Sequence, residues 1–170
     1  PTIVNCIIAN NHAPSSGGGM YSSNGSSPTV TGCTFTGNWT ETGVGGGPYA
    51  GEGDPIITNC SFNNNTSEIY GGGIRYDTGS LTLTDCSFTG NTASNGGGLS
   101  ISSAAATLTG CNFNDNQATD STFLGGGGGI GIFQSSPLLI NCSFVNNSAS
   151  ASSEADYNGG GAIHCWSIEE

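Results

Sequence analysis

A sequence motif centred on cysteine recurs six times along the 170-residue chain, and this repeat constrains the fold more than any other feature. Successive copies lie 27, 27, 26, 25 and 31 residues apart. Each cysteine is followed two residues later by a large apolar residue, five residues later by asparagine, and then by a cluster of glycines. Periods of about 20 to 50 residues are typical of solenoids, in which each unit stacks on its neighbours. The repeat cysteines are Cys6, Cys33, Cys60, Cys86, Cys111 and Cys142.

The residues around each cysteine alternate between apolar and polar, as in strands with one buried face. The residue three positions before each cysteine is aliphatic and lies mostly between threonines. A coil of about 25 residues holds three short strands, and stacked coils pair at ~4.8 Å. We therefore predict an all-β parallel β-helix, or β-solenoid, of six coils of about 27 residues. It forms a single domain over 1–170, with coils at approximately 1–27, 28–54, 55–80, 81–105, 106–136 and 137–170.

Asparagine occupies the same place in all six coils. A side-chain amide carries donors and an acceptor, so stacked copies can bond along the coil axis and also satisfy backbone groups of the turn. The glycine clusters suit a corner where coils approach closely or where φ is positive. Both features are interpreted as structural ladders, and the ladder asparagines are Asn11, Asn38, Asn65, Asn91, Asn116 and Asn147.

Two motifs carry a resemblance to a known family. They are Phe-x-x-Asn, as at Phe62 and Asn65, and Gly-Gly-x-aliphatic, as at 71–74. Together they resemble the repeats of chlamydial polymorphic outer-membrane proteins and, more broadly, bacterial right-handed parallel β-helix surface proteins. The resemblance implies right-handed coils, in agreement with the general rule for parallel crossovers. It also implies a secreted or surface-displayed solenoid, often adhesive, that is exported by an autotransporter.

The charge balance excludes two classes of partner. Twelve acidic residues face one basic residue, and the formal net charge is −11. Nucleic acids and anionic membrane surfaces both require a basic footprint, so neither is expected as a partner. Uninterrupted apolar runs are far shorter than the ~20 residues that span a bilayer, so no membrane insertion is expected. No phosphate loop or other cofactor motif occurs, and we expect no cofactor.

An enzyme is the first alternative, because polysaccharide lyases and glycosidases share this fold class. Lyases that act on acidic sugars need basic groups, and Arg75 is the single basic residue. Glycosidases need two carboxylates ~5.5 or ~6.5–9.5 Å apart, and the candidates in the middle coils are Glu52, Asp54, Glu68 and Asp77. Aromatic residues beside these carboxylates are sparse in the sequence. We therefore expect a non-enzymatic extracellular structural or adhesive solenoid, with a carbohydrate-active β-helix enzyme as the alternative.

Threonine pairs supply a second alternative. Their T-x-T spacing places both side chains on one outward strand face, in columns across the coils. This array resembles the flat ice-binding face of insect antifreeze β-solenoids. Threonine also suits any exposed strand, and Val4, Ile56, Leu138 and Ile140 interrupt the columns. The pairs are Thr29 and Thr31, Thr82 and Thr84, and Thr107 and Thr109.

The cysteines admit two interpretations. Neighbouring ladder cysteines would lie at the coil spacing, which is inside the Cα separation that permits a disulfide. A column of buried thiols that act as small apolar groups is favoured, because side chains in register point the same way. Cys165 lies off the ladder beside His164 and Trp166, where it either fills the core or links covalently to a neighbouring subunit. A metal site at His164 and Cys165 lacks further ligands, so no metal is expected.

Two further sets of residues are candidates for surface function. Five N-x-[ST] sequons outside the ladder are candidate glycosylation sites: Asn24, Asn59, Asn64, Asn141 and Asn146. The loops at 117–124 and 148–158 are the longest, and in solenoids insertions often collect on the binding face. They carry acidic and aromatic residues suited to calcium, glycan or host-surface ligands, although a solvated loop is the simpler interpretation. These residues are Asp120, Phe123, Glu154, Asp156 and Tyr157.

The register of the chain ends predicts self-association. From Gly47 to Ile56, and at three later corners, nine residues separate the last glycine of the cluster from the next first-strand position. Nine residues after Gly161 lies Glu170, in the register of Thr2. The strand around 167–170 can therefore meet the strand around Thr2 of another copy, and such non-closing contacts generate filaments. A segment of a longer solenoid, such as a surface stalk, would show the same register.

Overall fold

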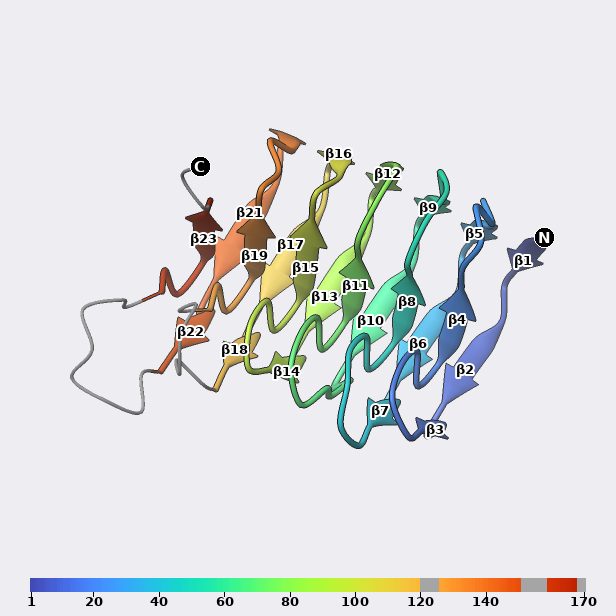
Figure 1. Cartoon of the computed structure of the whole chain (residues 1–170), viewed down its shortest axis with the longest axis horizontal. Coiled ribbons are helices and arrows are strands. Elements are labelled where there is room, and N and C mark those ends of the chain that lie inside the picture. Colours follow the sequence, from blue (N-terminus) through green and yellow to red (C-terminus); the bar gives the residue numbers. More distant parts are fainter. Residues whose placement is uncertain (120–125, 151–158, 168–170) are drawn as a thin grey trace.

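The structure, a computed structural model, describes residues 1–119, 126–150 and 159–167 and confirms the all-β parallel β-helix (Figure 1). The chain winds six times around the solenoid axis and contributes one strand to each of three sheets in every winding. We call each winding a rung. Five complete turns separate the first strand, β1, from its equivalent in the sixth rung, β20. The described residues contain strands and turns but no helix, so none of them forms a helix long enough to cross a membrane.

Three parallel six-stranded sheets form the walls of the solenoid. The first sheet contains β1 (Thr2–Val4), β5 (Thr29–Thr31), β9 (Ile56–Thr58), β12 (Ser80–Thr84), β16 (Ala105–Thr109) and β20 (Leu138–Ile140). The second contains β2 (Ile7–Ala9), β6 (Thr34–Thr36), β10 (Ser61–Asn63), β13 (Ser87–Thr89), β17 (Asn112–Asn114) and β21 (Ser143–Val145). The third contains β4 (Met20–Ser22), β8 (Pro48–Ala50), β11 (Ile74–Tyr76), β15 (Leu99–Ser102), β19 (Ile130–Phe133) and β23 (Ile163–Trp166).

Short strands connect the second sheet to the glycine corner. Two of them pair with each other, and the other three form a small sheet. Isolated bridges from Trp39 to Thr66 and from Thr66 to Thr92 join the two groups into one column along the solenoid. The short strands are β3 (His12–Ala13), β7 (Trp39–Thr40), β14 (Thr92–Ala93), β18 (Gln117–Ala118) and β22 (Ser148–Ala149).

The core is a set of columns, in which each apolar residue stacks on its equivalent in the next rung. In the first sheet the parallel register aligns the aliphatic residue before each cysteine, so that Leu83 lies between Ile57 and Leu108. In the second sheet the phenylalanine rings stack with centroids 4.5–5.2 Å apart. The rings in the middle of this column are fully buried. Columns of this kind explain how a chain with 30 glycines and 34% hydrophobic residues encloses a continuous core.

Two sharp corners, before and after the second sheet, require a left-handed backbone. At the first corner Asn59 has φ 53° and Gly32 has φ 63°; at the second, Asn64 has φ 53° and Gly90 has φ 64°. Glycine, asparagine and aspartate are the residues that adopt this region at least cost. Each corner position is therefore glycine, asparagine or aspartate in the different rungs, and the strands on either side of the corner keep their register.

The six repeat cysteines form one column at the first corner, and all seven cysteines are free thiols. The backbone N–H of Cys33 donates to the Sγ atom of Cys60 at 3.3 Å, and the Cys60 thiol donates to the Thr58 carbonyl oxygen at 3.3 Å. Burial raises the pKa of Cys60 above its usual range. Cys165 lies in the third sheet, in register with the core residue Ile132, and is exposed because it belongs to the sixth rung and only the fifth rung covers it.

Alkylation with N-ethylmaleimide at neutral pH is expected to separate the cysteines into three classes. Cys6 and Cys165 are exposed and should react fast, with Cys142 slower because it is half-buried and burial raises its pKa. The other four should react only after unfolding, because their thiols are out of contact with solvent: Cys33, Cys60, Cys86 and Cys111. Peptide mass spectrometry assigns each site. Fewer than seven adducts in denaturant without a reductant would instead support a disulfide in the ladder.

Candidate functional site

The asparagine ladder has a direction along the solenoid axis. The Nδ2 atom of Asn91 donates to the Phe62 carbonyl oxygen of the previous rung at 2.8 Å and to Asn116 Oδ1 of the next rung at 2.9 Å. Its Oδ1 atom accepts from the backbone N and the Nδ2 of Asn65, each at 3.0 Å. Bonds between amides therefore always run from donors in one rung to the acceptor in the next.

The two end rungs present opposite sides of this ladder. At the first rung, Asn11 donates to Asn38, and its own Oδ1 atom accepts no hydrogen bond within the described residues. At the sixth rung, Asn147 donates to the Phe113 carbonyl, and its backbone N–H finds no acceptor in that part of the chain. One end of the solenoid thus offers an acceptor at the position where the other end offers donors.

Apolar core residues are also left half-covered at both ends. Ile3, Ile8 and Met20 pack on the core from the first rung, and Leu139, Phe144 and Ile163 pack on it from the sixth. Each of these side chains continues a core column that has one neighbouring rung instead of two.

The register predicted for the C-terminal end is wrong by one residue. Ile163 pairs with Ile130. Ala162, and not Gly161, therefore stands at the position of Gly129. Residues 168–170 of the predicted strand, including Glu170, lie outside the described residues.

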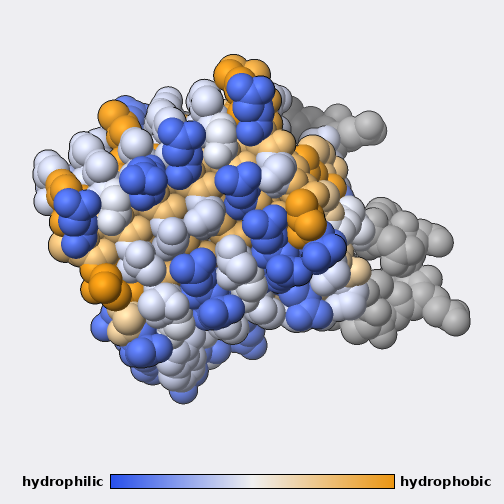
Figure 2. Space-filling model, turned by 180° about the vertical axis from the view of Figure 1, so that it is seen from behind, coloured by the Kyte–Doolittle hydropathy of each residue, from blue (hydrophilic) through white to orange (hydrophobic). Residues whose placement is uncertain are grey.

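The threonine columns of the first sheet are interrupted. The register aligns Thr82 with Thr107 and Thr84 with Thr109, so the fourth and fifth rungs carry complete adjoining pairs. In the third rung Ile56 takes the place of the first threonine, and in the sixth rung both places are aliphatic, at Leu138 and Ile140. The side of the molecule opposite to Figure 1 carries mainly hydrophilic and neutral residues with weakly hydrophobic rows between them, and its most hydrophobic residues form separate spots (Figure 2).

The four carboxylates considered for catalysis are not brought together as a set. Asp77 forms an ion pair with Arg75, at 2.5 Å between Nη2 and Oδ1. Asp54 accepts a hydrogen bond from the backbone N–H of Ser80 at 2.9 Å and so supports a turn. Glu52 and Glu68 are exposed. Two of the four carboxylates therefore have structural partners, and the other two lie in solvent.

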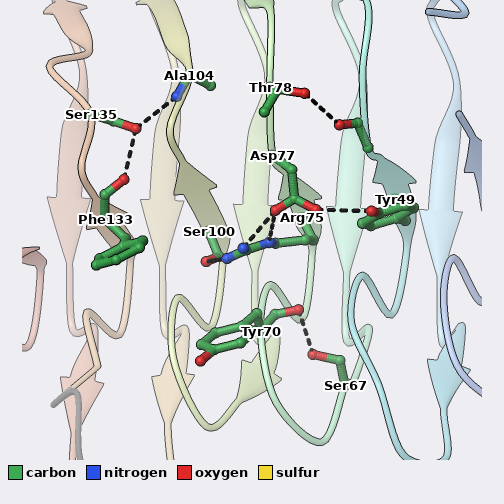
Figure 3. A network of polar contacts seen from close by, with 11 residues as sticks. Tyr49, Ser67, Tyr70, Arg75, Asp77, Thr78, Ser100, Ala104, Phe133 and Ser135 are labelled. Carbon is green, nitrogen blue, oxygen red and sulfur yellow. Dashed lines mark hydrogen bonds and ion pairs between the residues drawn. The ribbon is translucent and has the colours of Figure 1, made fainter. Parts of the chain in front are cut away.

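A polar and aromatic network on the outward face of the third sheet is the feature that sequence reasoning missed (Figure 3). Arg75 donates from Nε to Asp77 Oδ1 at 2.6 Å and from Nη1 to Ser100 Oγ at 2.7 Å. Its guanidinium lies 4.6 Å from the ring centroid of Tyr70, and the Tyr49 hydroxyl donates to Asp77 Oδ2 at 2.9 Å. Burial and the neighbouring carboxylate of Asp77 raise the pKa of Tyr49 to about 12, so this donor keeps its proton at neutral pH.

A hollow of about 250 Å³ opens beside this network. One wall is the stacked pair of Phe133 and Trp166, whose centroids are 4.6 Å apart. Burial lowers the pKa of His164, so its ring is neutral at pH 7. The hollow combines aromatic walls with a few polar groups, as binding sites for small molecules do. The lining residues are Tyr70, Arg75, Asn95, Ser100, Ser102, Gly131, Ile132, Phe133, His164 and Trp166.

The sequence contains one signal that could have found this face. In the first five copies the residue two positions after the last glycine of the cluster lies in one outward column of the third sheet. In the sixth copy Ala162 takes the place of that last glycine, so His164 is the residue in this column. Aligning the first five copies at the glycines would therefore have shown large aromatic or charged residues at equivalent positions, together with two small ones. This column is Tyr21, Tyr49, Arg75, Ser100, Gly131 and His164.

The candidate glycosylation sites lie at exposed turns. All five asparagines are exposed and have positive φ, including Asn24 in the turn that follows β4. The other four occupy the two left-handed corners on either side of the second sheet: Asn59, Asn64, Asn141 and Asn146. Asparagine tolerates this conformation well, so the corners provide a structural reason for its presence.

The residues proposed as a binding loop, which are Asp120, Phe123, Glu154, Asp156 and Tyr157, lie outside the described residues. Within 1–119, 126–150 and 159–167, no three His, Cys, Asp or Glu side chains gather as a metal site would require.

Comparison with known proteins gives one match. A family model described as a right handed beta helix region matches residues 1–167. Neither the search of curated proteins nor the search of solved structures returned a match. The match covers all six rungs, agrees with the three parallel sheets and provides the handedness of the coils. The chain therefore belongs to the family of right-handed β-helix proteins.

Proposed function

We propose that this chain is a non-catalytic, extracellular structural or adhesive β-solenoid, either a subunit that assembles head to tail or a segment of a longer surface stalk. The observation that carries the proposal is the complementarity of the two end rungs. The first rung offers the Asn11 Oδ1 acceptor, and the sixth offers donors at Asn147. The half-covered apolar columns continue across the same junction, from Phe144 of one copy to Ile8 of the next. Parallel strand addition would pair the exposed edges at this junction.

Surface display is supported by composition and by motif. The Phe-x-x-Asn and Gly-Gly-x-aliphatic repeats resemble those of chlamydial polymorphic outer-membrane proteins, many of which are adhesive. The chain has a net charge of −11 and 8% charged residues, so its surface consists largely of neutral polar groups. The absence of catalysis is supported by Asp77, whose carboxylate is held by Arg75 and Tyr49 instead of facing a second free carboxylate.

Sedimentation velocity and negative-stain microscopy are expected to show rods that lengthen as protein concentration rises. Phe144→Asp places a charge on the sixth-rung face, and Ile8→Asp places one on the first-rung face. Either substitution alone should prevent long rods, and an equimolar mixture should give dimers, because one intact end of each kind remains. The matched control is Ile7→Asp, since Ile7 is 77% exposed and points outward, and it should form rods like the parent.

Monomers at every concentration tested would overturn head-to-tail assembly. A dimer formed by Phe144→Asp alone would also contradict it, because that result requires two first-rung faces to pair with each other. Circular dichroism of each variant checks that the solenoid remains folded.

A further inference from the structure

We infer that the hollow on the outward face of the third sheet binds one neutral sugar ring. The inference deepens the adhesive part of the proposed function, and it does not require head-to-tail assembly, because all the lining residues belong to one copy of the chain. The hollow exists because the outward column of the third sheet changes size abruptly. Ser100 and Gly131 stand between Arg75 and His164, so two small residues separate two large ones. These small residues form a floor, and the large ones close its two ends.

Aromatic rings border the hollow on different sides. Phe133 and Trp166 stack on each other, and Tyr70 lies under the guanidinium of Arg75. A pyranose ring presents an apolar face of C–H groups, which packs on aromatic rings, while its hydroxyls point outward around the ring edge. Aromatic walls therefore favour a flat ligand with one apolar face over a fully hydrated one.

Polar groups in the hollow suit hydroxyl ligands. A guanidinium has five N–H donors, and those of Arg75 that are bonded face Asp77 and Ser100. One N–H on each terminal nitrogen remains to donate to a ligand. The hydroxyl of Ser102 and the neutral imidazole of His164 supply groups that can both donate and accept.

Charge and size narrow the ligand to a neutral single ring. Asp77 neutralises Arg75, and His164 is uncharged at pH 7, so the hollow has no net positive charge for a carboxylate. The net charge of −11 on the chain further disfavours an anionic sugar. A volume of about 250 Å³ lies just below the ~300–1,000 Å³ of pockets for drug-sized ligands, which suits one ring instead of a long chain.

Fluorescence of Trp166 tests the inference directly. The chain contains two tryptophans, and a Trp39→Phe background leaves Trp166 as the single reporter. The probes are methyl pyranosides of glucose, galactose and mannose, and methyl N-acetylglucosaminide. Glucuronate, galacturonate and a capped Ser-Gly-Ser peptide are the comparators. At least one neutral pyranoside is expected to give a saturable change in emission, and saturation-transfer NMR should show contact through its ring C–H groups.

Three variants locate the binding site. Phe133→Ala removes one wall and is expected to weaken binding about tenfold. Ser102→Phe fills the hollow without removing any of its polar or aromatic neighbours except the Ser102 hydroxyl, and should abolish binding. Tyr21→Ala is the matched control, because Tyr21 is an exposed aromatic residue of the same outward column that does not line the hollow. Its affinity should stay within about twofold of the parent.

Several outcomes would overturn the inference. They are the absence of saturable binding by every neutral pyranoside, preferred binding of a uronate or the peptide, and unchanged binding by Ser102→Phe. The junction proposal is tested separately, because Ser102→Phe should form rods like the parent. If the parent forms rods but binds no sugar, the proposal about the hollow is wrong. If the parent binds sugar but forms no rods, the proposal about head-to-tail assembly is wrong.

Discussion

Replacement of one ladder asparagine, Asn91→Leu, is expected to lower the free energy of unfolding by about 4 kcal/mol. The Asn91 side chain is fully buried and makes four hydrogen bonds. Leucine has a similar volume, so no large cavity forms, but it can neither accept nor donate. The backbone N–H and one amide hydrogen of Asn65 then lose their acceptor, and the Phe62 carbonyl loses a donor. Each buried polar group left unpaired costs about 1–3 kcal/mol.

Urea denaturation followed by circular dichroism measures this loss. The matched control is Asn114→Ala, which removes an asparagine side chain from an outward position of β17. The control should change the free energy of unfolding by less than about 0.5 kcal/mol, as is usual for surface positions. Equal losses from the two substitutions would show that the hydrogen bonds of the ladder add no stability, which would contradict the structural role of the ladder.

The fold was predictable because each rung repeats one physical solution. An aliphatic residue, a cysteine and a phenylalanine recur at fixed offsets, so any single copy predicts the buried positions of the others. In the structure Leu83, Cys86 and Phe88 are all fully buried. Parallel register then follows, since only in-register stacking places like residues over each other in every column.

The candidate site could not be predicted in the same way because it lies where the repeat varies. The outward column of the third sheet carries no common residue type, so the hollow follows from comparing the individual residues of the column and not from the repeated motif itself. The space depends on Gly131 and Ser100 standing between larger side chains, and its walls come from Tyr70 and Phe133 in different rungs. Few aromatic residues lie near the candidate carboxylates in the sequence. In the structure, the stacking of rungs brings Tyr49 to Asp77, although the two residues are 28 positions apart.

Positive φ explains part of the sequon pattern. Asn59 and Asn141 occupy the left-handed corner before the second sheet, where Gly32 and Gly110 stand in other rungs. Asparagine is frequent there for backbone reasons, and serine or threonine follows in the exposed strand of the second sheet. The preference for asparagine at the corner and for serine or threonine in the strand is therefore enough to produce the N-x-[ST] pattern without glycosylation.

Addition of one methyl group at the glycine corner, Gly72→Ala, is expected to lower the free energy of unfolding by about 3 kcal/mol. The backbone at Gly72 is compatible with alanine, so strain in φ does not contribute. A Cβ atom there would overlap the carbonyl oxygen of Thr92 and would lie 2.6 Å from that of Gly97, both in the next rung. Overpacking of this kind typically costs about 1–3 kcal/mol when neighbours can shift.

These neighbours cannot shift freely, because the rungs are bonded across the corner. The N–H of Gly73 donates to the Gly97 carbonyl at 3.0 Å, and wider spacing would stretch this bond and the adjoining sheet bonds. Gly25→Ala is the contrasting variant, since its Cβ would meet nothing within 4 Å but its φ is 72°. It should cost about 1 kcal/mol, from conformation alone. Urea denaturation measures the loss in the free energy of unfolding for both variants. Equal losses would show that the close approach of successive rungs does not require glycine at this corner.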